Sequence, residues 1–156
     1  MILILSIYLA ALGCWFGGIV FFSFFTAPAV FTVLPRPEAG QLISMIFPRY
    51  YMLGYVAGTA SLVLAIYFTA VRGPRIWWGG TTLALAIALG ITFYAGRVIL
   101  PRADAIRTVS EEPNPDPARK AEFDKLHRTS VMLNSAVLLL NLAAIVGTSG
   151  ALTSRG

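Results

Sequence analysis

The chain has 156 residues, of which 57% are hydrophobic and 12% are charged, and its formal net charge is +5. Soluble domains carry about 25% charged residues, so this composition and a mean hydropathy of +0.75 exclude an ordinary soluble domain and indicate a chain mostly immersed in lipid. The length suits a single domain over residues 1–156, and one cysteine, Cys14, excludes an intrachain disulfide.

The chain opens with a long uncharged segment, since no Asp, Glu, Lys or Arg occurs from Met1 to Pro35. About 20 apolar helical residues cross a hydrocarbon core roughly 30 Å thick, so we predict a first span over about residues 2–26. Pro28 lacks a backbone donor and should kink or end this helix. The pattern of residues 37–47 then predicts a short amphipathic helix in the membrane interface.

Three further apolar stretches predict the remaining spans, over about residues 50–71, 76–100 and 129–151. Between the last two lies a loop, residues 101–128, whose start should extend the third helix. Asp116 as N-cap and Pro117 at the first helical position predict that the last helix begins before the membrane. The sequence therefore predicts an all-α integral membrane four-helix bundle with a short interfacial helix between helices 1 and 2 and a cytoplasmic extension of helices 3 and 4.

Lys and Arg are divided unequally between the two sides of the predicted bundle. The loops after the first and third spans carry Arg36, Arg49, Arg102, Arg107, Arg119, Lys120, Lys125 and Arg128. The other side carries Arg72, Arg75 and Arg155. Because cytoplasmic loops are enriched in Lys and Arg, we predict both termini outside and the two larger loops in the cytoplasm, in a bacterial inner (plasma) membrane.

Small residues, which let helix backbones approach closely in lipid, recur on one face of each of the first three spans. They are Ser6, Ala10, Gly13, Cys14 and Gly17, then Gly54, Ala57, Gly58, Ser61 and Ala65, then Gly80, Ala84, Ala88, Thr92 and Gly96. We expect these faces to pack within the chain, and dimerisation through one of them is the alternative. Trp77 and Trp78 are expected in an aromatic belt at headgroup depth.

Polar side chains repeat along the last span. His127, Asn134 and Asn141 are spaced by seven residues, with Ser130 beside the first two and Thr148 continuing the series. Polar residues inside a span usually face the bundle interior, so this stripe should point at the other three helices. Interhelical hydrogen bonding is the structural interpretation, and a binding site is the functional one.

A candidate site follows from the cytoplasmic ends of the spans, which should bring arginines and a tyrosine close to His127. Positive charge beside a single histidine opposes a divalent ion, so we expect no metal there and favour an anion, a lipid headgroup or a proton relay. The predicted ligand-binding residues are Arg36, Tyr50, Arg97, His127, Ser130 and Asn134.

Several activities lack the residues that they require. One histidine cannot supply bis-histidine haem ligation, and the chain has no cysteine pair, no glycine-rich phosphate loop and no carboxylate inside a span. We therefore expect no enzyme activity, no catalytic residues and no cofactor. The expected partners are membrane lipids and either a homodimer or a larger membrane complex, with no nucleic acid.

Three segments carry a resemblance to a known family. They are Leu34-Pro35-Arg36 with Gly40 and Phe47-Pro48-Arg49-Tyr50, then Arg97 with Pro101-Arg102, then His127 with Ser130 and Asn134. Together they resemble the transmembrane protein 205-like family, a small four-helix membrane domain of unknown function. This layout is more distantly similar to the copper-resistance-D-like membrane proteins. The resemblance implies a four-helix bundle and brings no catalytic activity with it.

Three functions stay open at this stage. The favoured one is a non-enzymatic membrane protein whose polar and basic cytoplasmic face binds an anion, a lipid headgroup or a small solute in transport or resistance. The second is the handling of copper or platinum through Cys14, the methionines and His127. The third is a structural subunit of a larger membrane complex.

Overall fold

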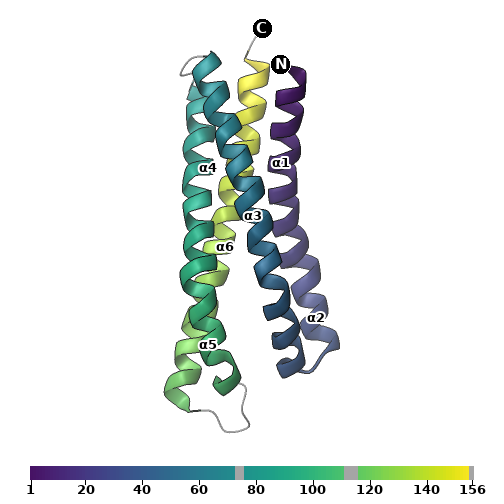
Figure 1. The fold of residues 1–156 in the computed structure, drawn as a ribbon, viewed down its shortest axis with the longest axis vertical. Helices are drawn as coiled ribbons and strands as arrows, with labels where there is room; N and C mark the ends of the chain where they lie inside the picture. Colours follow the sequence, from purple (N-terminus) through teal and green to yellow (C-terminus); the bar gives the residue numbers. More distant parts are fainter. Residues whose placement is uncertain (73–75, 111–115, 155–156) are drawn as a thin grey trace.

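The computed structural model describes residues 1–72, 76–110 and 116–154, without the side chains of Arg72 and of residues 108–110. The described residues form helices and no strand. These helices make up four long rods, which lie side by side, and α1 begins and α6 ends at the same end of the bundle (Figure 1). Each rod is long and apolar enough to cross a membrane. The chain is an integral membrane protein, and the predicted all-α four-helix bundle is confirmed.

The first rod continues past the proline that was expected to kink or end it. It consists of α1 (Ile2–Phe21), the π-helical turn η1 (Phe22–Thr26) and α2 (Ala27–Val33). In η1 the backbone N–H of Ala27 donates to the carbonyl of Phe22. A π turn widens the helix just before Pro28, whose ring would clash with a carbonyl one turn earlier in a regular α-helix. The helix therefore does not end at Pro28.

The third rod repeats this arrangement at the same end of the bundle. It consists of α4 (Ile76–Tyr94), the π-helical turn η2 (Ala95–Ile99) and α5 (Leu100–Ser110). The N–H of Leu100 donates to the carbonyl of Ala95, and Pro101 follows at the position that Pro28 holds in the first rod. The expected helical extension of the third span is present as α5, and residues 111–115 of the predicted loop lie outside the described residues.

The second rod is one helix, α3 (Arg36–Arg72), with Pro48 inside it. The prediction of a separate interfacial helix over residues 37–47 is therefore wrong, because this segment is the first part of α3. A proline within a helix is tolerated when nearby groups satisfy the freed backbone atoms. The N–H that Pro48 lacks would have donated to the carbonyl of Ser44, and one residue further along the guanidinium of Arg49 donates to the carbonyl of Met45 at 3.0 Å.

The fourth rod is α6 (Pro117–Thr153). Asp116 precedes it, and its Oδ1 accepts a hydrogen bond from the N–H of Ala118 at 3.0 Å. The predicted N-cap is confirmed. This cap satisfies one of the backbone donors that the first turn of a helix leaves free, so α6 can begin well before its apolar stretch.

The small-residue faces of the first two rods differ in where they point. The face of α3 (Gly54, Ala57, Gly58, Ser61 and Ala65) is buried, as expected, and it receives the ring of Trp15. A Cβ atom on Gly58 would lie 2.9 Å from Trp15 Cη2. The face of α1 around Cys14 is exposed, so the expectation that it packs within the chain is wrong. α1 turns its large side chains inward instead, because a groove of small residues accommodates large ones.

The two tryptophans at the start of α4 also differ. Trp77 is 43% exposed, whereas Trp78 is completely buried. The ring of Trp78 stacks on Phe68 with centroids 4.8 Å apart and meets Tyr8 edge-on at 5.9 Å. Only Trp77 is therefore available for the expected aromatic belt, and Trp78 belongs to the core.

Candidate functional site: a polar cluster inside the bundle

Three rods are joined by a chain of polar side chains between the middle of the bundle and the end that lies opposite the termini. The hydroxyl of Tyr50 on α3 donates to Oδ1 of Asn134 on α6. The amide nitrogen of the same Asn134 donates to Oγ of Ser23 at 2.9 Å. Ser23 belongs to η1, so the π turn of the first rod supplies the last member. We call Ser23, Tyr50 and Asn134 the inner polar cluster.

A second pair extends this cluster toward the same end. Tyr51, which is 7% exposed, lies close to the hydroxyl of Ser130. Aromatic rings surround these polar atoms, since Phe22 lies 4.7 Å from Tyr50 and Phe47 lies 6.1 Å from Tyr51, between ring centroids. The polar side chains therefore contact one another and are surrounded by aromatic rings, as expected for polar residues in a span.

A small cavity of about 20 Å³ adjoins the inner polar cluster. Its walls come from all four rods: Trp15, Gly18, Ile19, Tyr50, Tyr51, Leu53, Gly54, Thr92, Ala95, Leu133, Asn134 and Val137. A volume of this size holds about one water molecule. This cavity thus offers a water-sized space beside side chains that form hydrogen bonds, and no charged side chain lines it.

The charged members of the predicted site lie outside this interior. Arg36, Arg97 and His127 are exposed. The guanidinium carbon of Arg97 lies 5.7 Å from the centre of the Tyr55 ring, and His127 stacks on Phe123 with centroids 6.3 Å apart. Among the described residues, no hydrogen bond or ion pair links these three side chains to the inner polar cluster.

The six predicted residues therefore fall into two groups. The structure brings Tyr50 and Asn134 into direct contact and places Ser130 close to Tyr51, the neighbour of Tyr50 in the chain. It sets Arg36, Arg97 and His127 on the surface. That these six residues together bind a ligand stays a prediction.

The polar stripe of α6 faces inward for most of its length. Asn141 is 0% exposed and Thr148 is 2% exposed, and the hydroxyls of Thr148 and Tyr8 are hydrogen-bonded at 2.8 Å. The amide nitrogen of Asn141 donates to the carbonyl of Val137 at 2.9 Å. The expectation of an inward stripe is confirmed for these residues and wrong for His127, which is exposed.

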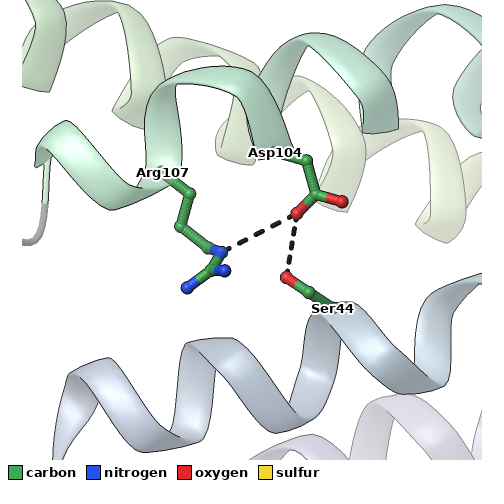
Figure 2. Close-up of polar contacts among 3 residues, drawn as sticks. All are labelled: Ser44, Asp104 and Arg107. Carbon is green, nitrogen blue, oxygen red and sulfur yellow. Dashed lines mark hydrogen bonds and ion pairs between the residues drawn. The ribbon is translucent and has the colours of Figure 1, made fainter.

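One polar contact that sequence reasoning missed links α3 to α5. Ser44 Oγ donates to Asp104 Oδ1 at 2.8 Å, and Arg107 Nε lies 3.7 Å from the same oxygen (Figure 2). Ser44 and Asp104 are 60 residues apart, and neither belongs to a motif, so the sequence carries no signal of the pair. Ser23, Tyr51 and Thr92 were also not among the predicted site residues.

Removing the Tyr50 hydroxyl tests the inner polar cluster. The variant Tyr50→Phe should lower the free energy of unfolding by about 1 kcal/mol, because interhelical hydrogen bonds in membranes contribute roughly 0.6–2 kcal/mol. The matched control is Tyr67→Phe, since Tyr67 is 38% exposed and should lose almost nothing. Denaturing-detergent titration measures both variants, and equal losses would contradict a stabilising role of the cluster.

Known proteins give three comparisons. A family described as a domain of unknown function (DUF4149) matches residues 10–112. An "Uncharacterized protein" of Aquifex aeolicus (strain VF5) is 29% identical over 138 residues, which is 88% of this chain and 91% of that protein. The probable nitrate/nitrite transporter NarK2 of Mycobacterium tuberculosis (strain CDC 1551 / Oshkosh) is 38% identical over 63 residues, 40% of this chain and 15% of the transporter. No solved structure gives a significant match.

Proposed function

The chain belongs to the DUF4149 family, a domain of unknown function, and we propose that it binds anionic groups at one end of its bundle without catalysing a reaction. This end, which we call the basic end, holds the beginning of α3 and the region from η2 to α5 (Figure 1). The observation that carries the proposal is a set of exposed arginines here. Arg36, Arg97 and Arg102 have no carboxylate partner among the described residues.

Arg97 is the arginine best prepared to hold an anion. Its position over the Tyr55 ring restricts the guanidinium while leaving its N–H donors unpaired among the described residues. A planar guanidinium can donate two parallel hydrogen bonds to a phosphate or another oxyanion. The turn η2 places Arg97 near the end of an apolar rod, at the depth where lipid phosphates are found if this rod spans the bilayer.

The ligand class follows from this chemistry, and two sources supply it. Phosphates of anionic lipids are one source, because each Lys or Arg near a negatively charged leaflet contributes about 1 kcal/mol. Small free oxyanions are the other, and the short match to a protein named as a nitrate/nitrite transporter makes nitrate a suitable probe. The same proposal includes a role in transport or resistance and membership of the transmembrane protein 205-like family. It also places the basic end on the cytoplasmic side of a bacterial inner membrane.

The test compares Arg97→Gln with wild type in lipid nanodiscs. Native mass spectrometry should show about fivefold less retained phosphatidylglycerol for Arg97→Gln, which corresponds to about 1 kcal/mol. The matched control is Lys120→Gln, which removes the same charge from an exposed position at the start of α6.

Calorimetry with phosphate and nitrate forms the second arm of the test. Loss of lipid alone identifies headgroups, loss of the free anion alone identifies a solute, and no difference from wild type in either arm overturns the proposal.

The copper or platinum alternative receives no support from the geometry. Cys14 and His127 would have to reach the same ion. The contact between Ser23 and Asn134 fixes the register of the first and fourth rods, with Cys14 displaced toward the termini and His127 displaced the other way. At 1.5 Å per helical residue, they lie roughly 20 Å or more apart along the bundle. Elemental analysis of the purified protein tests this alternative, and about one copper per chain would restore it.

Docking on a second membrane protein or a second copy is the other proposal that stays open. The outward face of α1 favours it, since a Cβ on Gly13 or Gly17 would meet no atom within 4 Å. Cys14 lies on this face and is exposed, which makes it a built-in probe. If two copies pair through α1, mild oxidation in native membranes should give a disulfide-linked dimer that Cys14→Ser abolishes. A chain that stays monomeric under oxidation would rule out this symmetric pairing.

A further inference from the structure

The cavity beside the inner polar cluster contains a hydrogen-bond donor that the protein leaves unsatisfied. Trp15 is 2% exposed, and its indole N–H has no acceptor among the described residues. A Cβ atom on Gly54 would lie 3.4 Å from Trp15 Nε1 and 3.1 Å from Thr92 Cγ2, and all three residues line the cavity. The indole N–H therefore lies beside Gly54, a residue of the cavity wall.

Leaving such a donor without a partner is costly. A buried polar group that loses its hydrogen bond costs about 1–3 kcal/mol, and lipid offers no water from outside to relieve it. Buried donors in folded proteins are almost always paired with protein or with an ordered water. An occupant of the cavity that accepts the indole hydrogen removes this cost.

The walls of the cavity also define what the occupant must be. No charged side chain lines it, so an ion would be poorly stabilised there. Thr92 donates its hydroxyl hydrogen to the carbonyl of Ala88 at 2.8 Å, which leaves its oxygen free to accept. A volume of about 20 Å³ admits one molecule the size of water.

We propose that this cavity binds one water molecule, which accepts the indole N–H of Trp15 and donates to the side-chain oxygens of the wall. The inference is independent of the proposed function, because the site is neutral and interior whereas the anion site is charged and exposed. The bound water adds a polar link between α1 and α4, next to the link that Asn134 makes between α6, α3 and η1.

Nuclear magnetic resonance of the full chain in nanodiscs tests the proposal. With ¹⁵N-labelled tryptophan, the indole N–H of Trp15, assigned through Trp15→Phe, should show a rotating-frame cross-peak to water with the sign of direct contact. Gly54→Ala should abolish this cross-peak, because the new methyl group would occupy the space beside Nε1. The control Gly90→Ala should retain it, since a Cβ there meets no atom within 4 Å.

The outcomes that overturn the proposal are specific. A folded wild-type protein without the cross-peak would show that the cavity is dry. A cross-peak of full intensity in Gly54→Ala would show that the water lies elsewhere. Should Gly54→Ala fail to fold, Thr92→Val removes the accepting oxygen at nearly constant volume and is expected to weaken the cross-peak at least twofold. An unchanged cross-peak in Thr92→Val would then contradict the assignment.

Discussion

Replacing Trp78 with alanine is expected to lower the free energy of unfolding by about 3 kcal/mol, at the lower end of the range for large-to-small aromatic substitutions in cores. The side chain is completely buried between Phe68 and Tyr8, with ring centroids 4.8 and 5.9 Å away. Lipid supplies no hydrophobic drive between helices, so the loss consists of packing contacts and the cavity left behind. We therefore expect the loss in free energy of unfolding to lie at the lower end of that range.

The neighbouring residue provides the control for this prediction. Trp77 is 43% exposed, and it packs against Gly150, where a Cβ would lie 2.7 Å from Trp77 Cδ2. We expect Trp77→Ala to cost about 1 kcal/mol, as for a partly exposed contact. Denaturing-detergent titration of both variants gives the two values. Equal losses would show that Trp78 is not a core residue of the bundle.

The sequence predicts the bundle because the relevant signals are local. A long stretch without charges predicts a span by itself, and Asp116 followed by Pro117 predicts a helix start by itself. Both predictions are confirmed. Prolines mislead for the same reason, since Pro28 and Pro48 are locally helix-breaking. A π turn precedes Pro28 and lets the first rod continue, and α3 continues through Pro48.

The directions of the helix faces could not be predicted in the same way. α1 and α3 each carry a face of small residues, and composition does not decide which of them receives the large side chains of the other. The structure resolves this by placing Trp15 against Gly54 and Gly58, which leaves Gly13 and Gly17 outside. This choice depends on the pairing of two helices far apart in sequence.

The candidate site was partly predictable for a related reason. The seven-residue spacing on α6 correctly placed Asn134 inside, because a helical repeat determines which residues share a face. Residues with the same membrane depth were expected to meet, yet depth does not determine position around the bundle. Tyr50 faces Asn134, whereas Arg97 lies on the surface over Tyr55. Ser23 lies within an aromatic run that gives no sign of a polar contact, yet its hydroxyl, in the π turn η1, accepts a hydrogen bond from Asn134.

The close approach of α3 and η2 depends on a single glycine. A Cβ atom on Gly96 would overlap the hydroxyl of Tyr55 and would lie 2.7 Å from Cδ1 and 2.8 Å from Cγ of Tyr51. The Tyr55 hydroxyl is the far end of a side chain and can move. The Tyr51 contacts are at the base of the ring, close to the backbone of α3, so the two rods would have to separate.

The variant Gly96→Ala should therefore lower the free energy of unfolding by about 2 kcal/mol, within the range for overpacked interiors. Moving Tyr51 would also disturb its edge-on ring contact with Tyr50, whose centroid lies 5.3 Å away. Gly90→Ala on the same rod is the control, because Gly90 is exposed and a Cβ there meets no atom within 4 Å. Alanine favours the helix over glycine by up to about 1 kcal/mol, so Gly90→Ala should be neutral or stabilising. If both variants unfold at the wild-type detergent concentration, α3 and η2 do not pack as closely as the Gly96 geometry requires.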